Sequence, residues 1–293
     1  MNPKTSSVLP ILLAFVITST LAHDDSGAQA SARYLANEGV LVSEQQTKVL
    51  FDPFFHNDYG TYQLVPETIR NAIFNAEPPY DGINAIVISH AHGDHFNAEE
   101  TVMFLKKHPK ITLVAPSQAI ALVTKAQGGD TLHKQLISLK LELGDAPKIT
   151  SLENLTIESI RIPHAGWPQR KEVMNLVHRV TLNDRFRIMH MGDADPSDEH
   201  FQPYKSHWEK STSDLAFPPY WFFLNSDGQS ILRQRINATQ SIGVHVPIEI
   251  PLKLVRSNND FFSIPGEVRL FEASDRHTSE RKNLPVQSTL QIQ

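Results

Sequence analysis

Short apolar runs alternate with helical segments through the first half of the chain. Strands are predicted where apolar residues gather between turn-forming residues, at 33–35, 39–43, 48–51, 85–88, 111–115 and 135–139. Helices are predicted between them, at 66–75, 98–107 and 116–127. In the segment 98–107, Val102, Met103 and Phe104 stand among charged residues. This alternation of strand and helix is typical of a sheet covered by helices.

The second half has the same plan with a different sequence. Strands are predicted at 155–162, 176–182, 185–191, 214–217, 241–246 and 267–272, with a helix at 229–236. Asn183 and Asp184 form a two-residue connection of the hairpin type. Because no Gly-, Ser- or Pro-rich linker divides the halves, we predict one α/β domain over residues 31–275. Its expected architecture is a four-layer αββα sandwich with the site between the sheets.

The N-terminal segment has the pattern of a secretion signal. Lys4 precedes a mostly apolar stretch at 8–22, and small residues suited to cleavage stand at Ala22 and Ala30. A proline interrupts the apolar stretch, which is shorter than the ~20 residues that a membrane helix needs. We therefore predict a signal peptide at 1–22, with cleavage as late as 30. An uncleaved anchor is the alternative.

The composition is informative mainly because the chain lacks cysteine and a net positive charge. The chain of 293 residues has no cysteine, hence no disulfides and no thiolate ligands. Together with the signal, this indicates a bacterial periplasmic or secreted protein. The net charge of −5 lacks the basic footprint of a phosphate-binding surface, so we expect a small-molecule substrate and no nucleic acid. We also expect a polar tail at 276–293 and no membrane span in the mature form, and the sequence does not indicate an oligomeric state.

The most informative stretch directly follows the predicted strand at 85–88. After one serine, the sequence HAHGDH supplies four ligand-type side chains: His90, His92, Asp94 and His95. Side chains two apart on an extended chain point the same way, so His90 and His92 can hold one cation together. The glycine allows a sharp turn, after which Asp94 and His95 can face a second cation. Imidazole and carboxylate are ligands that zinc prefers. A solvated histidine cluster is the alternative, but the strand-end position favours a metal site.

A metal held by two histidines needs further protein ligands. Candidates stand at or near the ends of later strands, with a glycine or proline close by: His164, Asp193 and His245. Each alone would be unremarkable, because a single histidine after a strand is more often structural. A carboxylate can bind through both oxygens, so Asp193 can bridge two cations about 3.5–4 Å apart.

The HAHGDH segment followed by His164, Asp193 and His245, in this order and at these intervals, resembles the metallo-β-lactamase superfamily. Asp52-Pro53 and Ser89 look similar to that family too, and the likeness covers almost the whole mature chain. The resemblance implies a first metal on His90, His92 and His164. It implies a second metal on Asp94, His95 and His245, with Asp193 bridging. The two divalent ions are expected to be Zn²⁺, with Mn²⁺ or Fe²⁺ as alternatives, since these ligands suit all three.

Within the superfamily, the sequence argues against a true β-lactamase. Those enzymes generally lack the bridging aspartate, and one large group uses a cysteine ligand that this chain does not have. Asp193 in a Gly-Asp context looks more like the lactonases, glyoxalase II-like thioesterases and phosphodiesterases. The loop at 242–245 is most similar to the ascorbate-6-phosphate lactonase-like branch.

We therefore expect a dinuclear metal-dependent hydrolase. Two cations that share a water lower its pKa towards ~7, which supplies hydroxide at neutral pH. This bridging hydroxide is expected to attack an ester, lactone or thioester of a small molecule. The resemblance implies that Asp94 passes a proton to the leaving group. The alternatives are a phosphodiesterase of the same fold and, less favoured, a metal-binding protein without turnover.

Aromatic residues offer candidates for a substrate pocket. Residues 217–223 contain more aromatic side chains than a loop needs. Most such runs are core, but pocket walls are apolar too. Trp167, Tyr220 and Trp221 are therefore pocket candidates, and they point to an apolar substrate. His178 and His200 are interpreted as structural or surface residues. His190 is interpreted as a core residue, with a position behind the metal ligands as the alternative.

Overall fold

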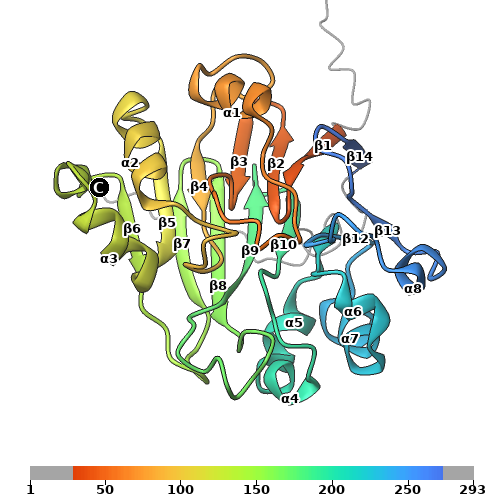
Figure 1. Cartoon of the computed structure of the whole chain (residues 1–293). Coiled ribbons are helices and arrows are strands. Elements are labelled where there is room, and N and C mark those ends of the chain that lie inside the picture. Colours follow the sequence, from red (N-terminus) through yellow and green to blue (C-terminus); the bar gives the residue numbers. More distant parts are fainter. Residues whose placement is uncertain (1–28, 273–293) are drawn as a thin grey trace, which may run out of the picture.

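Two facing sheets form the centre of the molecule, and helices cover their outer faces (Figure 1). The computed structural model describes residues 29–272. The first sheet has the strand order β14-β1-β2-β3-β4-β5-β6. From β3 to β6 the strands run parallel, whereas β14, β1, β2 and β3 pair antiparallel. The strands of this sheet are β1 (Gln29–Ala36), β2 (Gly39–Glu44), β3 (Thr47–Phe51), β4 (Ala85–Val87), β5 (Thr112–Pro116), β6 (Leu136–Leu139) and β14 (Val268–Glu272).

The second sheet has the order β13-β12-β11-β10-β9-β8-β7. Strands β7 to β10 pair antiparallel and β10 to β13 run parallel. As a result, β8, β10 and β12 point in the same direction. The strands are β7 (Lys148–Leu152), β8 (Leu155–Arg161), β9 (Leu176–Leu182), β10 (Phe186–His190), β11 (Leu215–Phe217), β12 (Gln240–Gly243) and β13 (Asp260–Phe261).

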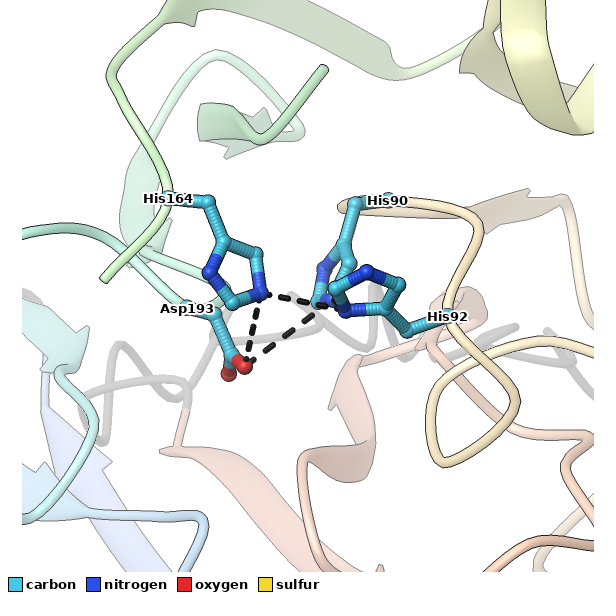
Figure 2. A group of neighbouring side chains, drawn as sticks. All are labelled: His90, His92, His164 and Asp193. Atoms are coloured by element: carbon cyan, nitrogen blue, oxygen red, sulfur yellow. Dashed lines mark hydrogen bonds and ion pairs between the residues drawn. The ribbon is translucent and has the colours of Figure 1, made fainter. Parts of the chain in front are cut away.

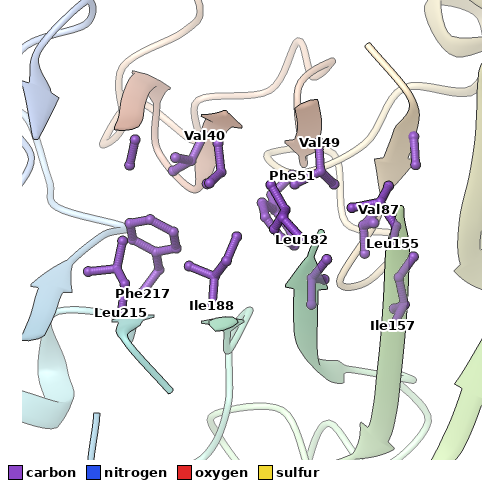
Figure 3. Packing of buried hydrophobic residues seen from close by; sticks show 14 of the residues in the cluster. Val40, Val49, Phe51, Val87, Leu155, Ile157, Leu182, Ile188, Leu215 and Phe217 are labelled. Carbon is purple, nitrogen blue, oxygen red and sulfur yellow. The ribbon is translucent and has the colours of Figure 1, made fainter. Parts of the chain in front are cut away.

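Alternate strand residues fill the space between the sheets (Figure 3). In β3, Val49 and Phe51 point into this core, whereas Leu50 between them faces the helices. Leu155 and Ile157 of β8 meet them from the second sheet. Since both faces of the central strands are buried, these strands are continuous apolar runs in the sequence, which made them predictable.

Helices on the outside complete the four layers. α1 (Glu67–Phe74), α2 (Ala98–Lys107) and α3 (Ser117–Lys125) pack their apolar side chains on the outer face of the first sheet. The second sheet is covered by short helices whose aromatic and aliphatic side chains share a cluster with β9, β10 and β11. The predicted αββα sandwich is thus confirmed. These short helices are α4 (Asp198–Phe201), α5 (Lys205–Lys210), α6 (Trp221–Leu224) and α7 (Ser226–Ile231), and α8 (Leu252–Val255) follows β12.

Two predicted elements of the second half need correction. The predicted helix at 229–236 spans the end of α7 and a π-helical turn at Leu232–Ile236. The predicted strand at 241–246 ends early, because β12 stops at Gly243 and His245 has a positive φ of 59°. The sequence pattern did not reveal β7, an edge strand that is mostly exposed and therefore has no apolar run. It also did not reveal β13 and the helices α4 to α6 and α8, which are too short to show a periodic pattern.

The predictions for the chain ends lie largely outside the described residues. The signal peptide, its cleavage after Ala22 and the tail at 276–293 are not among residues 29–272. β1 already begins at Gln29, which pairs with Glu272 of β14. Cleavage after Ala30 would therefore remove the first two residues of β1, whereas cleavage after Ala22 would leave the strand whole. Within the described part of the chain, no helix has the length and apolar character required to cross a membrane.

Candidate metal centre

Strand ends from both sheets meet at one edge of the sandwich. β4 of the first sheet leads into the HAHGDH segment. The second sheet contributes the residues that follow β8, β10 and β12, which run in the same direction. The structure therefore brings together all the side chains predicted as ligands: His90, His92, Asp94, His95, His164, Asp193 and His245.

Three imidazoles and one carboxylate form a first group, in which the side chains point toward one another (Figure 2). His92 Nδ1 lies 3.1 Å from His90 Nε2 and 3.1 Å from His164 Nε2. The Oδ2 atom of Asp193 lies 3.1 Å from His164 Nε2 and 3.9 Å from His90 Nε2. Four potential donor atoms thus surround one point, as in a tetrahedral zinc site.

The second group uses the other oxygen of the same aspartate. Asp193 Oδ1 lies 3.1 Å from His245 Nε2 and 3.3 Å from His95 Nε2. Asp94 Oδ2 completes the group at 3.3 Å from His245 Nε2 and 3.6 Å from His95 Nε2. The carboxylate of Asp193 is therefore divided between the two groups, one oxygen for each.

Gly192 sets the direction of the Asp193 side chain. Its φ of 52° is a left-handed conformation that glycine adopts without strain. A Cβ at this position would lie 2.4 Å from Asn175 Oδ1 and 2.7 Å from Ser89 Cβ. The same Asn175 oxygen accepts a hydrogen bond from the backbone N–H of Asp193 at 3.0 Å. The close packing needed to hold Asp193 thus leaves no room for a side chain before it.

Asn37, in the turn between β1 and β2, ties two of the ligand loops together. Its side-chain amide donates to the backbone carbonyl of Asp94 at 2.9 Å. Its own carbonyl accepts from the N–H of His245 at 2.9 Å. Two members of the second group, Asp94 and His245, are therefore positioned through hydrogen bonds of their backbone that do not require a metal.

Outer partners fix the orientation of several imidazoles. Asp52, at the end of β3, accepts hydrogen bonds from the backbone N–H of Ser89 at 2.8 Å and from its hydroxyl at 2.5 Å. The second oxygen of Asp52 also lies 2.9 Å from His95 Nδ1. Likewise, His164 Nδ1 donates to the carbonyl of Ala165 at 2.7 Å. In each histidine the Nε2 atom is left as the lone-pair donor, the arrangement found around protein-bound metals.

The two groups differ in how they bind protons. Burial lowers the pKa of His90 well below its usual value and lowers the pKa of His92 to about 4, so both are neutral at pH 7. Burial also opposes the charge of His95 and His245. Contacts with Asp193 and neighbouring carboxylates outweigh this, raising the pKa of His95 well above its usual value and that of His245 to about 9. Although burial disfavours its charged form, the same histidines hold the pKa of Asp193 well below the usual value.

Buried polar atoms without partners indicate that this donor set fits metal ions. Among the described residues, His95 Nε2, His245 Nε2 and Asp193 Oδ1 have no hydrogen-bond partner although solvent does not reach them. These atoms have ion-pair contacts with one another at 3.1 and 3.3 Å, but a buried polar atom that forms no hydrogen bond still costs about 1–3 kcal/mol, and all three face the centre of the second group. A cation there would satisfy them together.

A deeper buried cluster lies behind the second group. Glu38 is fully buried, and its carboxyl oxygens lie 3.9 Å from His95 Nδ1 and 3.7 Å from His190 Nε2 without a hydrogen bond. Burial raises the pKa of Glu38 well above its usual value. The sequence analysis missed this residue, because a glutamate in a turn after β1 carries no pattern. The ring of His190 stacks on Phe51 at 4.8 Å and lies in the core, as interpreted from the sequence.

The two other histidines also have structural contacts. His178 is fully buried, and its ring nitrogens contact the hydroxyl of Ser159 and the carbonyl of Ile88. His200 lies against Trp167 with ring centroids 5.7 Å apart, away from the ligand groups. Neither is among the side chains grouped around a potential metal.

A cavity of about 400 Å³ opens over the two ligand groups. Its floor includes His92, Asp94, Asp193 and His245. Its walls come from the loop after β3 and the loop after His164, and they are largely polar: Tyr59, Thr61, Tyr62, Arg170 and Glu172. The position of Tyr59 and Tyr62 in the aromatic loop that follows β3 was the sequence signal that could have identified them.

The aromatic residues predicted as pocket walls do not line this cavity. Trp167 lines a separate, smaller cavity beside His200. The ring of Trp221 packs behind His245 at 5.2 Å, and its indole N–H donates to the carbonyl of Ala194 at 3.1 Å. Tyr220 packs edge-on against Trp221. The chain enters α6 at Trp221, and Trp167 belongs to a different loop, so none of the three lines the cavity over the ligand groups. The aromatic run therefore gives no support here for an apolar substrate.

Comparison with known proteins identifies the family. Residues 47–210, more than half of the chain, match the family described as the beta-lactamase superfamily domain. The chain therefore belongs to this superfamily, which confirms the sequence-based assignment. UPF0173 protein YddR of Bacillus subtilis (strain 168) is 29% identical over 136 residues, which are 40% of this chain and 52% of that protein. The match thus spans about half the length of this curated relative.

Solved structures share the fold at low sequence identity. Igni18, a metallo hydrolase from the archaeon Ignicoccus hospitalis, superposes with a TM-score of 0.57 and 15% identity, over 84% of this chain and 100% of that one. The isothiocyanate hydrolase from Delia radicum gut bacteria gives a TM-score of 0.53 and 13% identity, over 83% of this chain and 100% of that one. The αββα architecture is therefore that of the metallo-β-lactamase fold.

Replacement of Gly192 by alanine is expected to displace Asp193. The new Cβ would meet Asn175 and Ser89, so we expect a loss of about 2–4 kcal/mol in the free energy of unfolding, from strain and overpacking, together with weaker metal binding. Denaturant unfolding and metal titration measure both. Gly82 has a φ of 64° with nothing near its Cβ position, so Gly82→Ala is the control with strain alone. Equal effects of the two variants would contradict the packing argument.

Replacement of Asp52 by asparagine is expected to weaken metal binding about 10–100-fold. The amide keeps the size of the side chain but removes the carboxylate that orients His95. Competition with a chromophoric chelator measures the affinity. Asp81, an exposed carboxylate that pairs with Lys48, provides the control variant Asp81→Asn. An unchanged affinity of Asp52→Asn would show that His95 needs no such partner.

Metal loading at pH 7 is expected to release about two protons, because His95 and His245 are protonated without metal while His90 and His92 are not. Calorimetry in buffers of different ionisation enthalpy counts them, and His245→Gln should release one fewer. For the metal-free protein, the raised pKa of His245 stabilises the fold below ~6.5 and this contribution is lost as the pH rises through about 9. Loading without proton release would contradict the proposed charge states.

Proposed function

We propose that this chain is a hydrolase that uses two divalent metal ions, with Zn²⁺ favoured, to cleave an ester, lactone or thioester of a small molecule. The observation that carries this proposal is the division of the Asp193 carboxylate. Its Oδ2 lies 3.1 Å from His164 Nε2, and its Oδ1 lies 3.1 Å from His245 Nε2. A carboxylate in this position can bridge cations about 3.5–4 Å apart.

The proposed reaction divides the work between the ions and the side chains. Bound divalent ions lower the pKa of a water molecule towards ~7 and polarise the bond under attack. His90, His92 and His164 would hold the first ion, and Asp94, His95 and His245 the second. Asp94 also lines the cavity. Burial disfavours its charge, but hydrogen bonding with His245 and the charge of His95 lower the pKa of Asp94, so it is an anion at neutral pH. In this proposal Asp94 also passes a proton to the leaving group.

Two observations support hydrolysis over simple metal storage, and a third concerns the kind of hydrolase. The ligand groups form the floor of a cavity of about 400 Å³ rather than a closed site, as expected of catalytic rather than structural metal centres. Asp193 and the absence of cysteine separate the chain from true β-lactamases. Two of the similar solved structures are a metallo hydrolase and an isothiocyanate hydrolase. The assignment to the lactonase-like branch and the periplasmic or secreted location are parts of this proposal.

Phosphodiester cleavage is the second candidate. The cavity includes Arg170, and a guanidinium suits a phosphate oxygen as well as a carboxylate. A bis-phosphate ester therefore belongs in the substrate panel beside lactones and thioesters.

Removal of the metal is expected to abolish hydrolysis. Chelation should reduce the rate to background, and adding back Zn²⁺, Mn²⁺ or Fe²⁺ should restore it. Asp193→Asn should lower kcat/KM by more than about 100-fold, because both groups lose an anionic ligand. Loss of a residue that only hydrogen-bonds to a metal ligand costs at most about 100-fold. Metal analysis, circular dichroism and rates on the substrate panel are the measurements.

His200→Gln is a suitable control, because His200 is a histidine outside the ligand groups. It should keep both metals and the wild-type rate. Hydrolysis by a metal-free preparation, or full activity of Asp193→Asn with one metal bound, would refute the dinuclear proposal.

A further inference from the structure

Arg170 brings a charge into the cavity that the ligand groups do not use. It lies in the loop after His164, and its side chain forms part of the cavity wall. Among the described residues that line this cavity, Arg170 alone carries a permanent positive charge. Tyr59, Thr61 and Tyr62, each of which carries a hydroxyl group, line the same space.

The backbone around Arg170 holds its side chain along one wall. The N–H of Arg170 donates to the carbonyl of Gly166 at 3.3 Å. Gly166 has a φ of 89°, and a Cβ built on it would lie 3.5 Å from Arg170 Cδ and 3.6 Å from Nε. The aliphatic part of the Arg170 side chain therefore lies against Gly166, which follows His164 by two residues. This contact lies along the wall of the cavity that Arg170 lines, and the arginine itself remains exposed to solvent.

The guanidinium of Arg170 has no protein partner within residues 29–272, since neither an ion pair nor a side-chain hydrogen bond joins it to another group there. Several other arginines of the described chain each bind a carboxylate: Arg161, Arg179, Arg235 and Arg269. Glu172 lines the same cavity, but no ion pair within 4.0 Å connects it with Arg170. The donors of Arg170 are thus available to a molecule in the cavity.

We propose that Arg170 binds an anionic group of the substrate, a carboxylate or a phosphate, while the bond to be cleaved lies over Asp193. The planar guanidinium offers two parallel N–H donors that match either anion. The carboxylates of the floor, Asp94 and Asp193, are engaged by histidines. This assignment rests on the proposed hydrolase function and specifies its substrate class as small, polar and anionic at the end opposite the reacting bond.

Matched substrates test this assignment. Esters of one acyl skeleton that end in a carboxylate, a phosphate or a neutral amide are compared with wild type, Arg170→Ala, Arg170→Lys and the control Lys171→Ala. Lys171 is an exposed cation next in the chain that does not line the cavity. Arg170→Ala should raise KM for the anionic ester about 10–100-fold, as expected for a charge-assisted hydrogen bond. It should leave kcat, the metal content and the neutral ester unchanged, and Arg170→Lys should restore part of the affinity.

The carboxylate and phosphate arms identify which anion the site prefers. Equal KM changes for anionic and neutral esters, or equal effects of Arg170→Ala and Lys171→Ala, would overturn the assignment. Weaker binding of the anionic ester in Glu172→Gln, with no effect of Arg170→Ala, would overturn it too, because the guanidinium would then not be the group that holds the anion.

A binding measurement separates this assignment from the proposed function. If wild type binds two metals but hydrolyses none of the esters, the function fails while the assignment can still be decided. Calorimetric titration of the metal-loaded protein with succinate or inorganic phosphate then compares wild type with Arg170→Ala. Binding weakened about 10-fold or more in the variant supports the anion site, and identical binding overturns it.

Discussion

One buried carboxylate, that of Asp193, lies between two sets of imidazoles, and the rest of the site is arranged around it. Its two oxygens lie 3.1 Å from histidine nitrogens on either side. A buried charge is costly unless it is paired and hydrogen-bonded, and here histidines from both sheets share it. Gly192, Asn175 and the backbone of Ala165 hold the carboxylate in this direction. The site therefore exists as a preformed set of donors whose unsatisfied atoms face inward.

The αββα fold supplies this arrangement through strand direction. β8, β10 and β12 run the same way, so the residues that follow them collect at one edge of the second sheet. The segment after β4 reaches the same edge from the first sheet. Rigid, doubly buried strands place the ligands, and the loops between them are free to differ in sequence. This division explains how a family can keep its centre while its cavity walls change.

Two loops supply the residues that form the cavity walls. The loop after β3 supplies Tyr59 and Tyr62, and the ring of Tyr62 packs edge-on against His245 at 4.1 Å. The loop after His164 supplies Arg170 and Glu172. Polar and charged groups therefore face the space above the ligands, while the aromatic run of α6 packs into the interior behind them. Selectivity in such a site depends on charge and hydrogen bonding more than on apolar contact.

The sequence by itself determined the layered fold, because strands buried on both faces must be apolar throughout and helices between them must be amphipathic. It also identified the side chains that the structure groups around two potential metal positions, since histidine and aspartate at strand ends form a local pattern that resembles a known family. It did not reveal Glu38, Asn37 or Arg170, whose surroundings come from segments far apart in the chain. Only the tertiary structure decided which loops line the cavity, because loop paths follow from packing and hydrogen bonds between segments rather than from any periodic pattern.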